Sequence, residues 1–346
     1  KVLVWLYQGG SGDRVDINLN GPFEREIWSR MSAADDGCSA DNCLKHTGGA
    51  CPFYRARQFA QSSHIIIVNH ALLLADVATG NRVLPEYDYL IVDEAHHLES
   101  ATTNALSFRA TQSDLVRLLR SFGSFGSGSS QSSGVLGRLL ALLHDSVRPS
   151  EYAAMNQLVE RASDHAFQLE SLVRAFFDTI DHFLFEQREG QSLGPYSQQV
   201  RILPATRIQP AWLEVEVAWE DAFKTAQALI GKVEQIAQAI VDLSEAGFGD
   251  VDLLEETYHD ISNLFTRLKE MIDNLEAMVF DPQPEAIYWA EIRSSGRGIT
   301  LQAAPLHIGP LVQKHIWHEK LSVVLTSATL TTAGEFDYLR GRLSAE

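Results

Sequence analysis

The sequence predicts an α/β protein with a large helical insertion and a small cysteine-rich segment. Residues 90–92 are a continuously apolar run and residues 321–325 a mostly apolar one, which is typical of strands buried in a parallel sheet. Between these runs, residues 135–279 carry apolar side chains at helical spacing, which indicates a bundle core. All three cysteines fall within one Gly-rich stretch, residues 38–51, which indicates a metal or cluster site.

Composition and charge limit the possible functions. With 346 residues, 45% of them hydrophobic and 21% charged, the chain is long enough for two or three folded domains. Residues 151–286 hold 25 acidic and 9 basic residues, and the rest of the chain holds 20 and 19. An acidic surface repels phosphates, so we expect nucleic acid to bind outside this segment or on a locally basic inner face of it.

The ends and apolar runs of the chain indicate neither a membrane protein nor a secreted one. No apolar run reaches the roughly 18 to 20 residues that span a bilayer, and we expect no secretory leader because residues 1–7 contain no cleavage-like small-residue site. The chain starts with Lys1 and enters an apolar segment at once. We therefore expect a piece of a longer protein that makes no membrane contact.

The first apolar run ends in two carboxylates followed by an imidazole, in the order Asp93-Glu94-Ala95-His96-His97. A parallel strand delivers such residues to the carboxyl edge of its sheet, where α/β proteins bind ligands. In a nucleotide-hydrolysing site, Asp93 would hold Mg²⁺ through water and Glu94 would deprotonate the attacking water. His96 would report the state of the γ-phosphate to another element. A strand followed by a polar helix cap is the alternative that this motif leaves open.

The second apolar run continues into Ser327, Ala328 and Thr329. Taken together, the two motifs resemble motifs II and III of superfamily 2 helicases. In that family the Ser-Ala-Thr strand lies beside the Asp-Glu strand, and its hydroxyls bind the histidine of the acidic motif. The resemblance therefore implies that the two runs are neighbouring strands. The phosphate-loop pattern G-x-x-x-x-G-K-[ST], however, occurs nowhere in the chain.

The three cysteines allow two kinds of metal site. An odd count disfavours a disulfide framework. With His46, the side chains of Cys38, Cys43 and Cys51 form a complete four-ligand Zn²⁺ set. Without it, they are three thiolates of a [4Fe–4S] cluster whose fourth cysteine lies elsewhere. Cysteines that bind no metal are the third possibility.

A helix is expected directly after the last cysteine, and it carries Arg55 and Arg57. Beside a cluster loop these arginines are candidate phosphate contacts, and a solvated helix face is the alternative. Residues 65–68 are then expected to form a buried strand that ends in Asn69 and His70. Those two side chains either act at the sheet edge or cap the next helix.

Further along, the pattern predicts regular elements with turn residues between them. We expect a helix over residues 98–119, helices over 222–243 and 253–278, and a hairpin of strands 286–293 and 298–302. In the first arm of the hairpin, Tyr288 or Trp289 either stacks on a base or packs in the sheet.

Five motifs carry a more specific resemblance. They are the Cys38/Cys43/Cys51 set, Cys-Pro-Phe-Tyr-Arg-Ala-Arg, Ile-Val-Asn-His-Ala-Leu-Leu, Val-Asp-Glu-Ala-His-His-Leu-Glu and Leu-Thr-Ser-Ala-Thr-Leu. In this order they resemble the DinG branch of the XPD-like iron–sulfur helicases. The resemblance implies a bacterial, cytoplasmic, 5′-to-3′ ATP-dependent DNA helicase with a role in DNA repair. It also implies a monomer that binds single-stranded and forked duplex DNA.

The resemblance also assigns cofactors and domains. It implies a [4Fe–4S] cluster on Cys38, Cys43 and Cys51, with a fourth cysteine before residue 1, and Mg²⁺ at Asp93 with ATP as substrate. The implied domains are an iron–sulfur domain at 1–62, part of the first RecA-like domain at 63–110 and 287–346, and a helical arch domain at 111–286.

The chain departs from this family in three ways. It has no Walker A loop, no fourth cysteine and no second RecA-like domain after Glu346. We therefore expect the isolated chain to be inactive as a helicase. The alternative from another class is a non-catalytic zinc-binding module that binds nucleic acid or protein.

Overall fold

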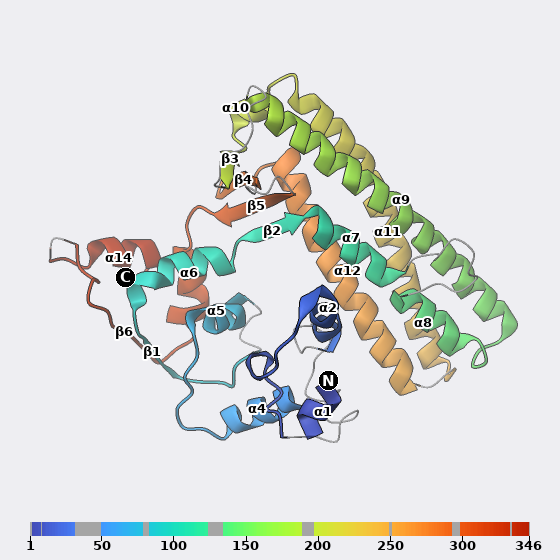
Figure 1. Ribbon diagram of the computed structural model, residues 1–346, viewed down its shortest axis with the longest axis horizontal. Helices are drawn as coiled ribbons and strands as arrows, with labels where there is room; N and C mark the ends of the chain where they lie inside the picture. The colour runs from blue at the N-terminus through green and yellow to red at the C-terminus, as the bar shows by residue number, and fades with distance from the viewer. Residues whose placement is uncertain are drawn as a thin grey trace. The chain divides into compact units, whose positions relative to one another are not determined.

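A computed structural model of the chain describes residues 2–7, 9–31, 50–78, 83–123, 134–188, 197–248, 251–292, 298–332 and 334–345. The fold is mixed α/β and mostly helical, with two small sheets in this part of the chain (Figure 1). The chain divides into a first unit of residues 1–106 and 307–346 and a second unit of residues 107–306. The second unit is thus an insertion in the sequence of the first.

The first unit contains short helices and a two-stranded parallel sheet. The strands are β1 (Tyr89–Val92) and β6 (Ser322–Leu325), which lie side by side with Val92 opposite Leu325. The helical elements before β1 are α1 (Val2–Tyr7), η1 (Arg14–Asp16), α2 (Gly21–Met31), α4 (Pro52–Gln61) and α5 (His70–Ala78). Those after it are η2 (Ala95–His97), α6 (Leu98–Ala105), α13 (Gly309–Val312), η3 (Gln313–Trp317) and α14 (Asp337–Leu343).

Helices cover one face of the β1–β6 sheet. Val92 is buried there in a core with side chains of α5, α6, α13, η3 and α14. On the other face, Tyr89 and Ile91 are each 71% exposed. The prediction that both apolar runs form strands is correct. The prediction that these strands are buried is wrong for the face that carries Tyr89 and Ile91. Alternate side chains of a strand point to opposite faces, and the helices of this core pack on only one of them.

Residues 65–68 do not form the expected buried strand. They are described, yet they are assigned to no strand, and Ile65 and Ile67 are 80% and 92% exposed. A strand exists only when its backbone hydrogen-bonds to a neighbouring strand. The β-branched residues that suggested this strand express only a local preference, because no neighbouring strand pairs with them in the described part of the chain.

The second unit combines long helices with an antiparallel sheet. Its strands, β2 (Phe108–Thr111), β3 (Gln198–Arg201), β4 (Ala286–Ile292) and β5 (Ile299–Pro305), lie in the order β2-β5-β4-β3. Its helices are α7 (Gln112–Phe122), α8 (Gly134–Leu143), α9 (Pro149–Gln187), α10 (Pro204–Arg207), α11 (Trp212–Glu245) and α12 (Val251–Val279). None of the helices within the described ranges has the length and apolarity needed to cross a membrane.

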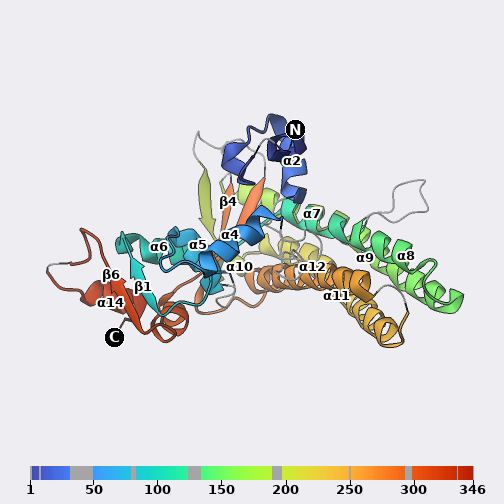
Figure 2. The same cartoon turned by 90° about the horizontal axis from the view of Figure 1, so that it is seen from below.

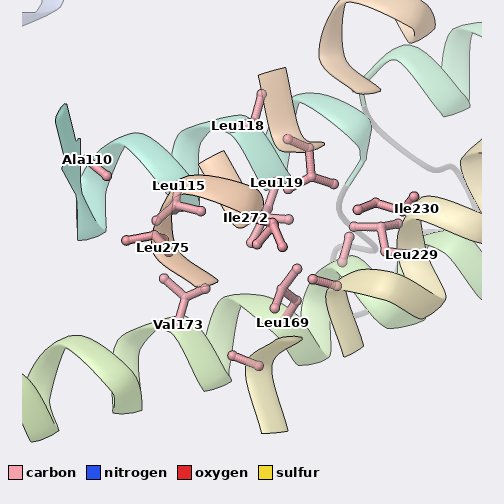
Figure 3. Close-up of a cluster of buried hydrophobic side chains, with 14 of the residues drawn as sticks. Ala110, Leu115, Leu118, Leu119, Leu169, Val173, Leu229, Ile230, Ile272 and Leu275 are labelled. Atoms are coloured by element: carbon pink, nitrogen blue, oxygen red, sulfur yellow. The ribbon is translucent and has the colours of Figure 1, made fainter. Parts of the chain in front are cut away.

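The helices of the second unit share one apolar core, as their spacing predicts. Helices α9, α11 and α12 run alongside one another (Figure 2). Figure 3 shows where the side chains of α7, α9, α11 and α12 meet, together with Ala110 of β2. The labelled members besides Ala110 are Leu115, Leu118, Leu119, Leu169, Val173, Leu229, Ile230, Ile272 and Leu275. The apolar stripes are therefore core positions.

The prediction of a single helix over residues 98–119 is wrong. Helix α6 ends at Ala105, strand β2 follows, and α7 begins at Gln112. A reciprocal cap starts α7: the Thr111 hydroxyl accepts from the Asp114 amide at 3.1 Å, and the Asp114 carboxylate accepts from the Thr111 amide at 3.2 Å. The T-x-x-D pattern was a visible start signal, but pairing of β2 with β5 decided the strand before it.

The expected hairpin is confirmed as β4 and β5, and it lies in the second unit. The domain prediction placed residues 287–346 with the motor portion, whereas the first unit resumes only at His307. Tyr288 is 5% exposed, and its hydroxyl accepts from the Gln283 amide at 3.1 Å, so it is a packing residue. The three named domains themselves stay a prediction.

Candidate active site

The two sequence motifs meet at one edge of the β1–β6 sheet. Because the strands are parallel, both carboxyl ends lie at the same edge. Beyond the strands, the Thr326 amide donates to Val92 O at 2.9 Å, and the Ala95 amide donates to Thr326 O at 3.0 Å. The prediction that the two runs are neighbouring strands is therefore confirmed.

The His96 side chain of the acidic motif lies between Glu94 and Ser327. Its Nδ1 is 2.7 Å from Ser327 Oγ and 3.2 Å from Glu94 Oε2. The His96 and Glu94 side chains are 34% and 62% exposed, so the pair is open to solvent. Both contacts use the same ring nitrogen, so a change in the position or charge of Glu94 acts directly on the His96–Ser327 contact.

Glu94 has a strained backbone. Its φ of 49° and ψ of 42° lie in the left-handed region, which costs an L-residue roughly 1–2 kcal/mol. The Glu94 amide donates to Asp93 Oδ1 at 2.9 Å, and Glu94 O accepts from the His97 amide at 2.9 Å. Such a conformation persists only where surrounding contacts hold it, and it is typical of functional turns.

The structure assigns different contacts to Asn69 and His70. Asn69 Oδ1 accepts from the Leu72 amide at 2.8 Å, so Asn69 caps the start of α5. His70 Nε2 instead lies 2.9 Å from the backbone oxygen of Asp93. Sequence reasoning left both roles open for both residues and did not connect His70 with the acidic turn. The only available signal was its position at the end of an apolar run.

The hydroxyl motif consists of Ser327, Ala328 and Thr329, and its last two residues contribute less than Ser327 to the contact with His96. Ala328 and Thr329 are exposed in the turn after β6. The Thr329 amide is 3.4 Å from Ser327 Oγ, which is a long contact. Within the described ranges, no group of three or more His, Cys, Asp or Glu side chains is arranged to hold a metal ion.

Most of the cysteine-rich site lies outside the described residues, including Cys38, Cys43 and His46. Cys51 is half-buried and directly precedes α4. On that helix Arg55 is exposed, whereas Arg57 is partly buried with its guanidinium 6.0 Å from the centre of the Phe53 ring. The helix expected after the last cysteine is thus present, and one of its two arginines is exposed on it.

Comparison with known proteins agrees with these motifs. The DEAD_2 family model matches residues 40–115, which include the acidic motif. Over 99% of its length the chain is 27% identical to the 3'-5' exonuclease DinG of Bacillus subtilis. It is 25% identical to the ATP-dependent DNA helicase DinG of Photobacterium profundum over 90% of its length, and 24% identical to that of Escherichia coli over 96%. The chain spans only 35%, 41% and 42% of these three proteins. The chain is therefore similar in sequence to DinG proteins over most of its length, in agreement with the resemblance that its five motifs carry.

Proposed function

We propose that this chain is part of an ATP-dependent DNA helicase in which the Asp93–His96 motif hydrolyses ATP. The observation that carries the proposal is the 2.7 Å contact between His96 Nδ1 and Ser327 Oγ, which joins the two motifs across paired strands. Two of the relatives bear the name ATP-dependent DNA helicase, and the Bacillus protein is named as an exonuclease. We favour the helicase because an acid pair at a sheet edge, joined to a second strand by the His96–Ser327 contact, is what a nucleotide-hydrolysing motor would need.

Each carboxylate of the motif has a separate part in the proposed reaction. Glu94, with its side chain 62% exposed, accepts a proton from the attacking water and orients that water toward the γ-phosphate. Asp93 is exposed at the same sheet edge and would hold Mg²⁺. An exposed carboxylate suits Mg²⁺, which usually binds through one or two carboxylates, waters and nucleotide phosphates, and which would neutralise charge on those phosphates.

Ser327 would transmit the state of the site to the rest of the protein. His96 contacts Glu94 and Ser327 through one nitrogen, and Ser327 lies two residues after the end of β6. A change in the position or charge of the Glu94 carboxylate during hydrolysis would therefore act through His96 on Ser327, and so on the end of β6. This gives a physical route from ATP chemistry to movement on DNA.

Replacing Ser327 by Ala should separate hydrolysis from strand separation. The variant loses the hydroxyl that contacts His96 but keeps the acid pair, so ATP hydrolysis by the full-length protein should fall only a few-fold. Unwinding of a forked duplex should fall more steeply, because the coupling contact is absent. Parallel ATPase and strand-displacement assays measure both rates, and equal losses in the two would contradict the coupling role.

The remaining parts of the proposal follow the family resemblance. They are 5′-to-3′ movement on single-stranded DNA, a monomeric state, action on forked duplexes and a partial RecA-like domain in the first unit. Arg55 is exposed on α4 and would contact the phosphate backbone, with Arg57 beside it. The isolated chain should show no ATPase activity, because it contains no phosphate loop to hold the β- and γ-phosphates.

We further propose that Cys38, Cys43 and Cys51 bind a [4Fe–4S] cluster. Cys51 stands at the amino-terminal end of the 10-residue helix α4, where the helix dipole favours the negative charge of a ligated thiolate. Three clustered thiols suit iron–sulfur ligation, with the fourth ligand supplied elsewhere. A cluster would hold together a Gly-rich loop that has few apolar residues for a core of its own.

Metal analysis separates the cluster from a zinc site. Anaerobically purified protein should contain iron and absorb broadly in the visible range, and a His46→Ala variant should keep both properties. Zinc would instead require His46 as its fourth ligand, so this variant would lose the metal. Stoichiometric zinc without iron in the wild-type protein would favour the non-catalytic zinc-binding module.

A further inference from the structure

We propose that His70 is a positioning residue that holds the backbone of the Asp93–Glu94 turn in its active conformation. This inference rests on the proposed role of Glu94 in ATP hydrolysis. His70 Nε2 is 2.9 Å from Asp93 O, and that oxygen belongs to the peptide group that joins Asp93 to Glu94. Because a peptide group is planar, one hydrogen bond to its oxygen restrains the whole plane, including the Glu94 amide.

The restraint acts where the backbone needs it. Glu94 is one of two non-glycine residues with positive φ in the described part of the chain, and its left-handed conformation is costly without support. On the amino side of Glu94, His70 binds the preceding carbonyl. On the carboxyl side, the Ala95 amide donates to Thr326 O at 3.0 Å. The two contacts come from different segments and hold the turn from both sides.

The element that carries His70 is well anchored. Leu73, Leu74 and Val77 of α5 are 3%, 1% and 4% exposed. Two of them, Leu74 and Val77, pack in the same core as Val92 of β1. The start of α5 is capped by Asn69, so the His70 side chain is not needed for that purpose. A helix packed against the strand thus presents the imidazole to the turn at a fixed position.

The chemistry of the contact predicts which substitutions can replace histidine. A carbonyl oxygen only accepts, so His70 must donate through a protonated Nε2, as one neutral tautomer and the imidazolium both can. Glutamine carries its amide nitrogen the same number of bonds from Cβ as Nε2 of histidine. Asparagine is one bond shorter, and alanine has no donor.

Steady-state ATPase assays on the full-length protein test the proposal. His70→Ala should lower kcat about tenfold, as expected when one restraining hydrogen bond is lost, while KM for ATP stays close to wild type. His70→Gln should recover most of kcat, and His70→Asn should not. Asn69→Ala is the matched control, because it removes the helix cap and lowers the melting temperature but keeps the imidazole. Its kcat should remain near the wild-type value.

A double-mutant cycle shows whether His70 acts through Glu94. In a Glu94→Gln background, His70→Ala should cause little further loss of kcat, because the group that it positions is already absent. An equal loss in both backgrounds, or a His70→Ala protein with full kcat, would overturn the positioning role. Wild-type protein without DNA-stimulated ATPase activity would instead overturn the proposed function, so the two failures are distinguishable.

Discussion

Replacing Glu94 by Gln is expected to slow ATP hydrolysis by the full-length protein severely while leaving nucleotide binding intact. The amide is similar in shape to the carboxylate but cannot accept a proton from water, and loss of a general base costs about 10²- to 10⁴-fold in rate. Asp93 is unchanged, so the proposed Mg²⁺ ligand remains. The measurements are single-turnover hydrolysis and equilibrium binding of a labelled nucleotide.

A nearby carboxylate provides the control for this prediction. Glu86 is exposed just before β1 in the same unit and does not contact the acidic turn in any hydrogen bond or ion pair of the described residues. Glu86→Gln changes the net charge by the same amount and should hydrolyse ATP at the wild-type rate. Normal turnover in Glu94→Gln would refute the role of Glu94, and turnover lost equally in both variants would indicate a general charge effect.

The largest effect on stability is expected at Trp219 of α11. This side chain is fully buried, its ring centre lies 4.9 Å from that of Phe176 on α9, and its Nε1 donates to Glu276 Oε2 on α12 at 2.5 Å. It therefore joins three helices of the second unit. Trp219→Ala should lower the free energy of unfolding by about 3–5 kcal/mol, measured by urea denaturation followed through the helical circular dichroism signal.

Two further substitutions separate the causes of this loss. Trp219→Phe keeps most of the ring packing but leaves the Glu276 carboxylate without its donor, so it should cost less, about 1–3 kcal/mol. Phe167→Ala on α9 removes a side chain that is 72% exposed and should change stability by no more than about 0.5 kcal/mol. A Trp219→Ala loss no larger than that of Phe167→Ala would show that the three-helix contact contributes little.

The parts of the fold that sequence could predict are those with a local signal. Helices α9, α11 and α12 follow from apolar spacing, because each helix shows its buried stripe within its own residues. The antiparallel arms of the hairpin are predicted for the same reason, through alternation along β4. Two predictions were wrong: strand β2 was expected to be helix, and the exposed residues 65–68 were expected to be a strand. Both errors arise because strand formation depends on a partner from elsewhere in the chain.

The chemical groups of the site and their order can be read from the sequence: an acid pair with a histidine follows one apolar run, and hydroxyls follow another. Which of these groups touch depends on the folded chain. The His96–Ser327 contact joins residues 231 positions apart, and the His70–Asp93 contact joins two elements whose link no periodicity reveals. The left-handed backbone of Glu94 likewise depends on contacts from outside its own turn. Local patterns fix the spacing of side chains along one element, whereas contacts between distant residues depend on how the whole chain packs.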